Sequence, residues 1–222
     1  MYIQDKIYGN IEFSDLAQSI IDTPEFQRLR RIKQVGVLFL VFPSANHSRF
    51  EHSLGVYHLA KTFAKSLVED LEIPEKKRLI ELIGIAGLVH DLGHLAFSHL
   101  FEVFLHKNDI EFNHEELSQK LFRNICSKYK IKLSEEEINI IINLIHPSTD
   151  WKSGFVWKNV NLGIWAFQIV ANPSNGLDVD KFDYLIRDSL SCGINVKFSS
   201  DRIIKMSKII GNEIVYPWKM RY

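Results

Sequence analysis

Apolar residues recur at intervals of three and four along most of the chain, which predicts a mainly helical fold. Between residues 49 and 71, Phe50, Leu54, Leu59, Phe63 and Leu67 mark one face of a long amphipathic helix. Pro74 opens a second helix, whose apolar positions continue to residue 89. Similar spacing predicts helices that begin near residues 14 and 24, and helices over residues 115–129, 134–145, 160–170, 180–191 and 200–209.

Short β segments are predicted only near the two ends. Residues 2–13 alternate loosely around Gly9-Asn10, and Gly211-Asn212 separates the apolar runs 209–210 and 213–216. Glycine next to asparagine favours a tight turn, so both segments indicate hairpins. The predicted fold class is therefore all-α, with minor β-hairpins near the N- and C-termini.

The overall composition indicates one globular domain. The chain has 222 residues, of which 46% are hydrophobic, and its 27 basic and 27 acidic residues cancel. We therefore predict a single domain over residues 1–222 and no membrane partner, and the balanced charge does not favour a nucleic-acid partner. Cys126 and Cys192 are too few for a disulfide scaffold, and no apolar stretch reaches the roughly 18 residues of a membrane span. We expect a soluble, intracellular protein.

Candidate chemistry is concentrated at the end of the second long helix. The apolar run of residues 79–89 leads directly into His90 and Asp91, and two more histidines follow within ten residues. Buried imidazole and carboxylate groups need hydrogen bonds or a metal, although a lone His-Asp pair is more often structural. His52 and Asp180 are the natural further ligands. Two histidines and two aspartates suit Zn, Fe, Mn, Co or Ni and leave positions open for water and substrate.

Several sequence blocks together resemble one enzyme family. The blocks are residues 22–30 (DTPEFQRLR), 49–55 (RFEHSLG), 90–99 (HDLGHLAFSH) and 178–188 (DVDKFDYLIRD). In this order they resemble HD-domain phosphohydrolases, and among these the deoxynucleoside triphosphate (dNTP) triphosphohydrolases of the sterile-alpha-motif/HD-domain type and their bacterial dGTPase relatives. The resemblance extends to about residue 205, with the predicted metal-binding core over residues 45–195.

The resemblance implies cleavage of a dNTP into deoxynucleoside and inorganic triphosphate. It implies His52, His90, Asp91 and Asp180 as ligands of a divalent transition metal, with Mg on the substrate phosphates. It further implies roles for residues that would contact the substrate or transfer a proton. These are Arg49, His94, Lys181 and His99 on the phosphates, His114 as catalytic histidine with Glu102 as its partner, Gln34, Tyr184 and Asp188 on the sugar, and Val35 against a 2′-hydroxyl. Whether His99 or His114 gives the proton stays open.

A regulatory nucleotide site is implied only in part. Asp22, Gln27 and Arg30 resemble activator contacts of the family, with Arg202 as a further candidate, but salt bridges and helix caps explain such residues equally well. Family members are generally longer, and their C-terminal part contributes to base recognition and to the oligomer. We therefore expect a monomer or dimer rather than a nucleotide-activated tetramer.

Two other functions compete with dNTP triphosphohydrolysis. The first is an HD-type phosphatase that removes phosphates stepwise or acts on nucleoside monophosphates. The second is a non-catalytic nucleotide- or nucleic-acid-binding module that uses Arg28, Arg30, Arg31 and Lys33 as a basic patch. Intact triphosphate among the products would indicate the triphosphohydrolase rather than the phosphatase. Substitution of His90 and Asp91 by alanine would abolish hydrolysis but leave the activity of a binding module largely intact.

Overall fold

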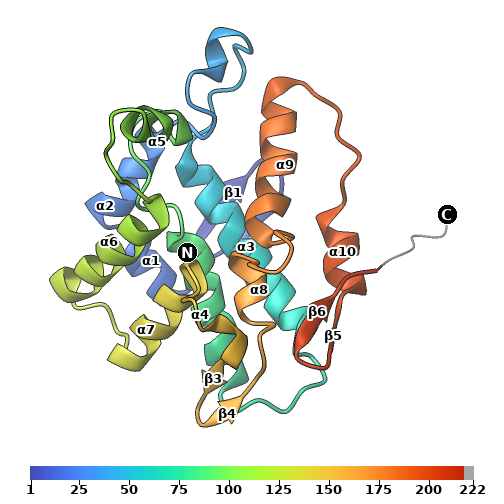
Figure 1. The fold of residues 1–222 in the computed structure, drawn as a ribbon. Helices are drawn as coiled ribbons and strands as arrows, with labels where there is room; N and C mark the ends of the chain where they lie inside the picture. The colour runs from blue at the N-terminus through green and yellow to red at the C-terminus, as the bar shows by residue number, and fades with distance from the viewer. Residues whose placement is uncertain (218–222) are drawn as a thin grey trace.

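The structure is a computed structural model that describes residues 1–217, and within this range it is mainly helical (Figure 1). The helices are α1 (Asp15–Ile21), α2 (Pro24–Gln27), α3 (Arg49–Leu67), α4 (Lys76–Val89), α5 (His99–His106), α6 (His114–Tyr129), α7 (Glu135–Ile145), α8 (Phe167–Val170), α9 (Val179–Cys192) and α10 (Ser200–Met206). Short 3₁₀ turns are η1 (Arg28–Arg31), η2 (Leu38–Leu40) and η3 (Trp151–Ser153).

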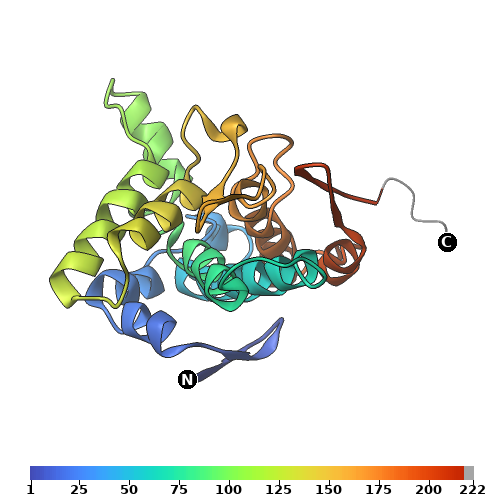
Figure 2. The same cartoon turned by 90° about the horizontal axis from the view of Figure 1, so that it is seen from below.

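The centre of the fold is the pair formed by α3 and α4, which lie side by side in Figures 1 and 2. Gly87 of α4 permits their close approach, because a Cβ atom there would lie 3.0 Å from the Val56 carbonyl oxygen of α3. Helix α7 packs on α4 and α6 packs on α7, while α9 and α10 pack on α3. This arrangement brings the end of α4 and the starts of α3 and α9 to one region.

In the described part of the chain, three antiparallel hairpins lie around the helices. They are β1 (Tyr2–Asp5) with β2 (Gly9–Glu12), β3 (Val156–Trp157) with β4 (Val160–Asn161), and β5 (Lys208–Ile210) with β6 (Glu213–Val215). Tyr2 pairs with Glu12 in the first hairpin and Lys208 with Val215 in the last. The predicted fold class, mainly helical with short hairpins near both ends, is confirmed.

The helix predicted over residues 160–170 is wrong in its first half. Val160 lies in β4, and only Phe167–Val170 is helical. Lys158 and Asn159 form a turn with positive φ angles of 48° and 63°, which the helix pattern does not reveal. Trp157 fixes this hairpin, since its buried ring donates a hydrogen bond from Nε1 to the Pro74 carbonyl oxygen at 2.6 Å.

Other helix boundaries also differ from the predictions. The helix expected to reach residue 71 ends at Leu67, and the segment after Pro24 changes to a 3₁₀ turn at Arg28. The last helix ends at Met206 because residues 208–210 pair in β5. Helix α5 was not predicted. Within residues 1–217, no helix has the length and apolar character needed to cross a membrane. The single domain over residues 1–222 stays a prediction, and its last five residues lie outside the described range.

Candidate metal centre and active site

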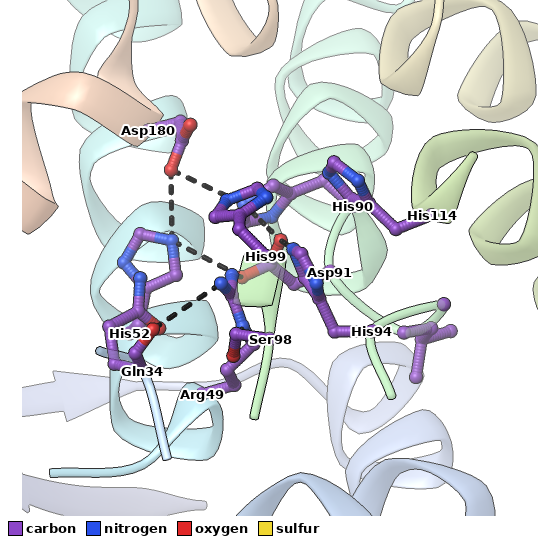
Figure 3. Close-up of polar contacts among 12 residues, drawn as sticks. Gln34, Arg49, His52, His90, Asp91, His94, Ser98, His99, His114 and Asp180 are labelled. Carbon is purple, nitrogen blue, oxygen red and sulfur yellow. Dashed lines mark hydrogen bonds and ion pairs between the residues drawn. The ribbon is translucent and has the colours of Figure 1, made fainter. Parts of the chain in front are cut away.

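Four side chains, from α3, from α9 and from the turn that follows α4, converge at one point (Figure 3). His52 lies in the first turn of α3, His90 and Asp91 directly follow α4, and Asp180 is the second residue of α9. Asp180 Oδ1 lies 2.9 Å from His52 Nε2 and 3.5 Å from His90 Nε2. Asp91 Oδ2 lies 3.5 Å from His52 Nε2, and Asp91 Oδ1 lies 3.4 Å from His90 Nε2. The four predicted metal ligands therefore face one another.

The two histidines present their Nε2 atoms to this point. His52 Nδ1 donates to Asp183 Oδ2 at 2.8 Å, and His90 Nδ1 donates to the Gly87 carbonyl oxygen at 2.7 Å. These hydrogen bonds hold the proton on Nδ1. Both Nε2 atoms are buried and without a hydrogen-bond partner, since the Asp180 carboxylate lies near them but not in hydrogen-bonding geometry. Unpaired nitrogens beside carboxylates fit a cation.

The electrostatics of the site also favour a cation. Burial opposes the charge on His52, but the Asp180 and Asp183 carboxylates outweigh burial and raise its pKa to about 10. Burial likewise opposes the charge on His90, whose pKa is raised by Asp91 and Asp180. Ligand atoms of His52, His90 and Asp91 lie within 4.8 Å of one another, and Asp180 is close to both imidazoles. These side chains can hold a metal ion.

Asp180 leaves one side of this centre open. Its side chain is 37% exposed, whereas the side chains of His52 and Asp91 are 0% and 4% exposed. Arg49 lines both cavities beside the centre and donates to Asp91 Oδ2 and to Ser98 Oγ. An ion bound by the four residues therefore has a face toward solvent or substrate.

A second cluster of polar groups lies next to the first, around Glu102 of α5. Glu102 Oε1 lies 2.7 Å from His114 Nδ1, and its Oε2 lies 3.0 Å from His99 Nδ1. The His114 ring stacks on His94 with 3.9 Å between centroids. Gly93 allows this approach, because a Cβ atom there would lie 2.0 Å from the His114 carbonyl oxygen. The structure thus brings together the predicted catalytic residues, whose roles remain proposals.

His94 connects the two clusters. Its Nε2 lies 3.3 Å from Asp91 Oδ1 and its Nδ1 lies 3.8 Å from Glu102 Oε1, although neither nitrogen has a hydrogen-bond partner. Burial lowers the pKa of His94 to about 3. The imidazole is therefore neutral near pH 7 and carries one donor and one acceptor toward the cleft.

Two adjoining cavities open over these clusters. The smaller, of about 270 Å³, is lined by residues that include His90, Asp91 and His114, and the larger has a volume of about 830 Å³. The larger cavity is lined by apolar residues of segment 35–41 and by Phe97 and Leu100. Four predicted sugar-contacting residues line the larger cavity: Gln34, Val35, Tyr184 and Asp188.

Some predicted substrate and regulatory residues make other contacts. The ammonium group of Lys181 lies beside Gly176, where a Cβ atom would be 3.2 Å away, and Lys181 is not among the residues that line these two cavities. Gln27 Nε2 donates to the Ile21 carbonyl oxygen, and Arg30 donates to Gln27 Oε1 while its guanidinium lies over the Phe50 ring. The phosphate role of Lys181 and an activator site with exposed Asp22 and half-buried Arg202 stay predictions.

The proposed basic patch is largely engaged within the chain. Arg28 donates to the carbonyl oxygens of Leu92 and His94, so it clamps the turn that carries the histidines. Lys33 Nζ donates to the backbone and side-chain oxygens of Asn46 at 3.0 Å. These contacts give the cations a structural role.

Asp183, Arg187, Ser98 and Asp5 were not identified as site residues from the sequence. The spacing of Asp183 and Arg187 could have indicated their contact, because a carboxylate and a guanidinium four residues apart meet on one helix face. Ser98 has a positive φ of 53° and joins Arg49 to the Lys33 carbonyl oxygen. Asp5 is distant in sequence from every other site residue, and the pattern of residues gives no indication of its contact with Arg187.

Comparison with models of protein families identifies the family of this chain. A model of the HD domain matches residues 49–188, a range that contains all four metal-facing residues. The chain belongs to the HD domain family. The protein L394 of Acanthamoeba polyphaga mimivirus, named for an HD domain, is 39% identical over 95% of this chain and 48% of its own length.

Relatives named as enzymes match a similar span. Deoxynucleoside triphosphate triphosphohydrolase SAMHD1 of Bos taurus is 40% identical over 93% of this HD domain chain and 38% of its own length. The SAMHD1 homolog of Dictyostelium discoideum is 39% identical over 99% of this chain and 42% of its own length. The chain thus spans less than half the length of these relatives. The predicted resemblance is confirmed.

Proposed function

We propose that this HD domain protein is a metal-dependent hydrolase of dNTPs that releases deoxynucleoside and inorganic triphosphate. The observation that carries the proposal is the convergence of His52, His90, Asp91 and Asp180 beside a cleft that also contains the His114–Glu102 pair. The names of the relatives support dNTPs as the substrate class.

The four proposed ligands offer a divalent ion two nitrogen atoms and two carboxylates. His52 and His90 offer Nε2 lone pairs, because their Nδ1 protons are engaged by Asp183 and Gly87. Asp91 and Asp180 supply negative charge. A divalent ion in such a site lowers the pKa of a bound water and neutralises charge on phosphate oxygens.

The proposed reaction requires one proton to reach the leaving group. The oxygen of a water molecule bonds to the α-phosphorus, and the bond from phosphorus to the 5′-oxygen breaks. The 5′-oxygen takes up a proton from a general acid, and the water gives up a proton to solvent, from which the general acid is protonated again. We assign this proton to His114, whose Nδ1 lies 2.7 Å from Glu102 Oε1 and whose ring is stacked on His94. An imidazole oriented by a carboxylate is a typical general acid. His99 shares the same carboxylate and is the alternative donor.

The larger cavity suits the nucleoside. Its volume of about 830 Å³ lies within the range of small-molecule sites, about 300–1,000 Å³. Tyr184 offers a ring for packing on the deoxyribose, and Asp188 and Gln34 offer polar groups for the 3′-hydroxyl. Val35 lies on the same wall, where its side chain would disfavour a 2′-hydroxyl.

Product analysis tests the proposal. The purified chain is incubated with each dNTP and rNTP in the presence of Mn, Mg, Co or Fe, and the products are identified by phosphorus NMR. We expect intact triphosphate from dNTPs. Orthophosphate or diphosphate would indicate the stepwise phosphatase, and nucleotide binding without turnover would indicate the non-catalytic module.

A pair of variants separates the metal centre from nonspecific effects. We expect the double substitution of His90 and Asp91 by alanine to abolish hydrolysis, because it removes two of four proposed ligands. His106→Ala is the matched control, since this exposed histidine on α5 contacts the Phe112 carbonyl oxygen. Retained hydrolysis in the double variant would contradict the proposal.

A further inference from the structure

A buried chain of hydrogen bonds joins His52 to the N-terminal hairpin. The Asp183 carboxylate accepts from His52 Nδ1 at 2.8 Å, and Arg187 donates to both of its oxygens, from Nε at 2.8 Å and from Nη2 at 2.9 Å. Arg187 Nη1 then donates to Asp5 Oδ2 at 2.9 Å. The side chains of His52, Asp183 and Arg187 are 0% exposed.

These hydrogen bonds fix the ring orientation of His52 as well as the position of its proton. A carboxylate held by two guanidinium hydrogen bonds has one position, so the imidazole that donates to it has one ring orientation. That orientation aims His52 Nε2 toward Asp91 and Asp180. Buried ion pairs contribute little net stability compared with apolar packing, so stability alone does not explain the network.

Gly55 of α3 provides independent support for this role of Asp183. It lies on α3, one turn after His52, and a Cβ atom there would lie 2.0 Å from Asp183 Oδ1 and 2.5 Å from Arg187 Nη2. Glycine inside a helix is unfavourable compared with alanine. At this position it leaves the space in which Asp183 and Arg187 meet His52.

Asp5 uses its two carboxylate oxygens for two different contacts. Its Oδ1 accepts from the backbone N–H groups of Ile7 and Tyr8, which shapes the turn between β1 and β2, while its Oδ2 accepts from Arg187. Figure 2 shows this hairpin at the edge of the molecule, below α3. One carboxylate thus connects an outer hairpin to the residue that orients His52.

We propose that Asp183 is a positioning residue for His52 and is held in place by Arg187 and Asp5. Through Asp5, the β1–β2 hairpin then helps to fix the orientation of His52 at the metal centre. The inference rests on the proposed role of His52 as a metal ligand. Loss of a group that orients a metal ligand typically lowers metal affinity about 10- to 100-fold. We expect that range for Asp183→Asn, whose amide N–H groups would face the Arg187 donors, and a smaller loss for Asp5→Asn and Gly55→Ala.

Glu81→Gln is the matched control. Glu81 accepts from Ser14, Tyr57 and Lys61 and thereby ties α1 and α3 to α4, but none of these contacts reaches His52. A general loss of stability would therefore affect this variant as well. Its zinc affinity should equal that of the unsubstituted chain.

Two measurements are made on each full-length variant after circular dichroism has confirmed its helical content. Zinc affinity is measured by competition with a chromophoric chelator. The Nδ1–H proton of His52 is followed by ¹⁵N-edited NMR with and without zinc, and we expect it far downfield in the unsubstituted chain and shifted upfield in Asp183→Asn. If Asp183→Asn does not fold, Asp5→Asn and Gly55→Ala decide.

The outcomes separate this inference from the proposed function. Unchanged zinc affinity and an unchanged His52 signal in the folded variants would overturn it, as would an equal loss of affinity in Glu81→Gln. Neither measurement depends on hydrolysis. If the unsubstituted chain binds no zinc, the metal centre itself fails, and the inference fails with it even where the NMR signal shows that Asp183 orients His52.

Discussion

Gly93→Ala should disable the proposed site without removing any of its functional groups. Gly93 lies between Asp91 and His94, and its φ angle is outside the positive range that strains alanine. The added Cβ atom would lie 2.0 Å from the His114 carbonyl oxygen, 2.6 Å from Ser118 N and 2.9 Å from Leu117 Cβ. Two of these are backbone atoms, so rotation of a side chain does not relieve the contact.

The required movement sets the size of the effect. Ordinary contact begins at 3.4 Å, so the turn and the start of α6 must separate by about 1.4 Å, the difference between 3.4 and 2.0 Å. A displacement of about 1 Å between reacting groups typically costs about 100-fold in rate. We therefore expect kcat for dNTP hydrolysis to fall about 100-fold or more in Gly93→Ala.

The assay is steady-state release of triphosphate, with the rate normalised to bound metal. Gly211→Ala is the control, because Gly211 lies in the β5–β6 turn at a φ of +64° with nothing within 4 Å of the added Cβ atom. It adds backbone strain far from the site and should retain its rate. A Gly93→Ala rate within a few-fold of the unsubstituted chain would refute the argument that His114 must approach the Asp91 turn this closely.

Three further predictions concern proton transfer, pH and packing. Glu102→Gln should lower kcat about 100-fold or more by removing the carboxylate charge beside His114, with bound metal unchanged in elemental analysis. Burial lowers the pKa of His58, so the unfolded chain binds this proton more readily and stability falls as pH drops below about 6.5. Urea unfolding at pH 7.5 and 5.5 should show a smaller fall in His58→Gln, and an equal fall would contradict this assignment. Trp157→Ala should cost about 3–5 kcal/mol of unfolding free energy, because it removes a buried ring and its hydrogen bond to Pro74. A cost below about 1 kcal/mol in urea titration would show that the ring does not anchor the β3–β4 hairpin.

The long helices were predictable because large apolar residues recur at helical spacing, even though α3 and α4 are buried on most sides. Helix α3 buries Phe50, Leu54, Leu59 and Phe63, the positions whose spacing indicated it. The middle hairpin was not predictable in this way. Its turn depends on positive φ angles at Lys158 and Asn159, and an apolar strand of two residues leaves no periodicity to detect.

The metal-facing residues were predictable because their types and order resemble a known family, and the structure brings all four together. The residues that orient them were harder to find. Asp183 and Arg187 carry a recognisable spacing, but their partners His52 and Asp5 lie on other elements. Contacts between elements that are distant in sequence depend on tertiary packing, which a single sequence does not specify.

Anomalous diffraction from crystals of the zinc-loaded chain tests the central claim most directly. We predict one ion bound by His52 Nε2, His90 Nε2 and a carboxylate oxygen from each of Asp91 and Asp180, at about 2.0–2.2 Å. An ion held elsewhere, or one with the Asp180 carboxylate beyond bonding distance, would contradict the proposed centre.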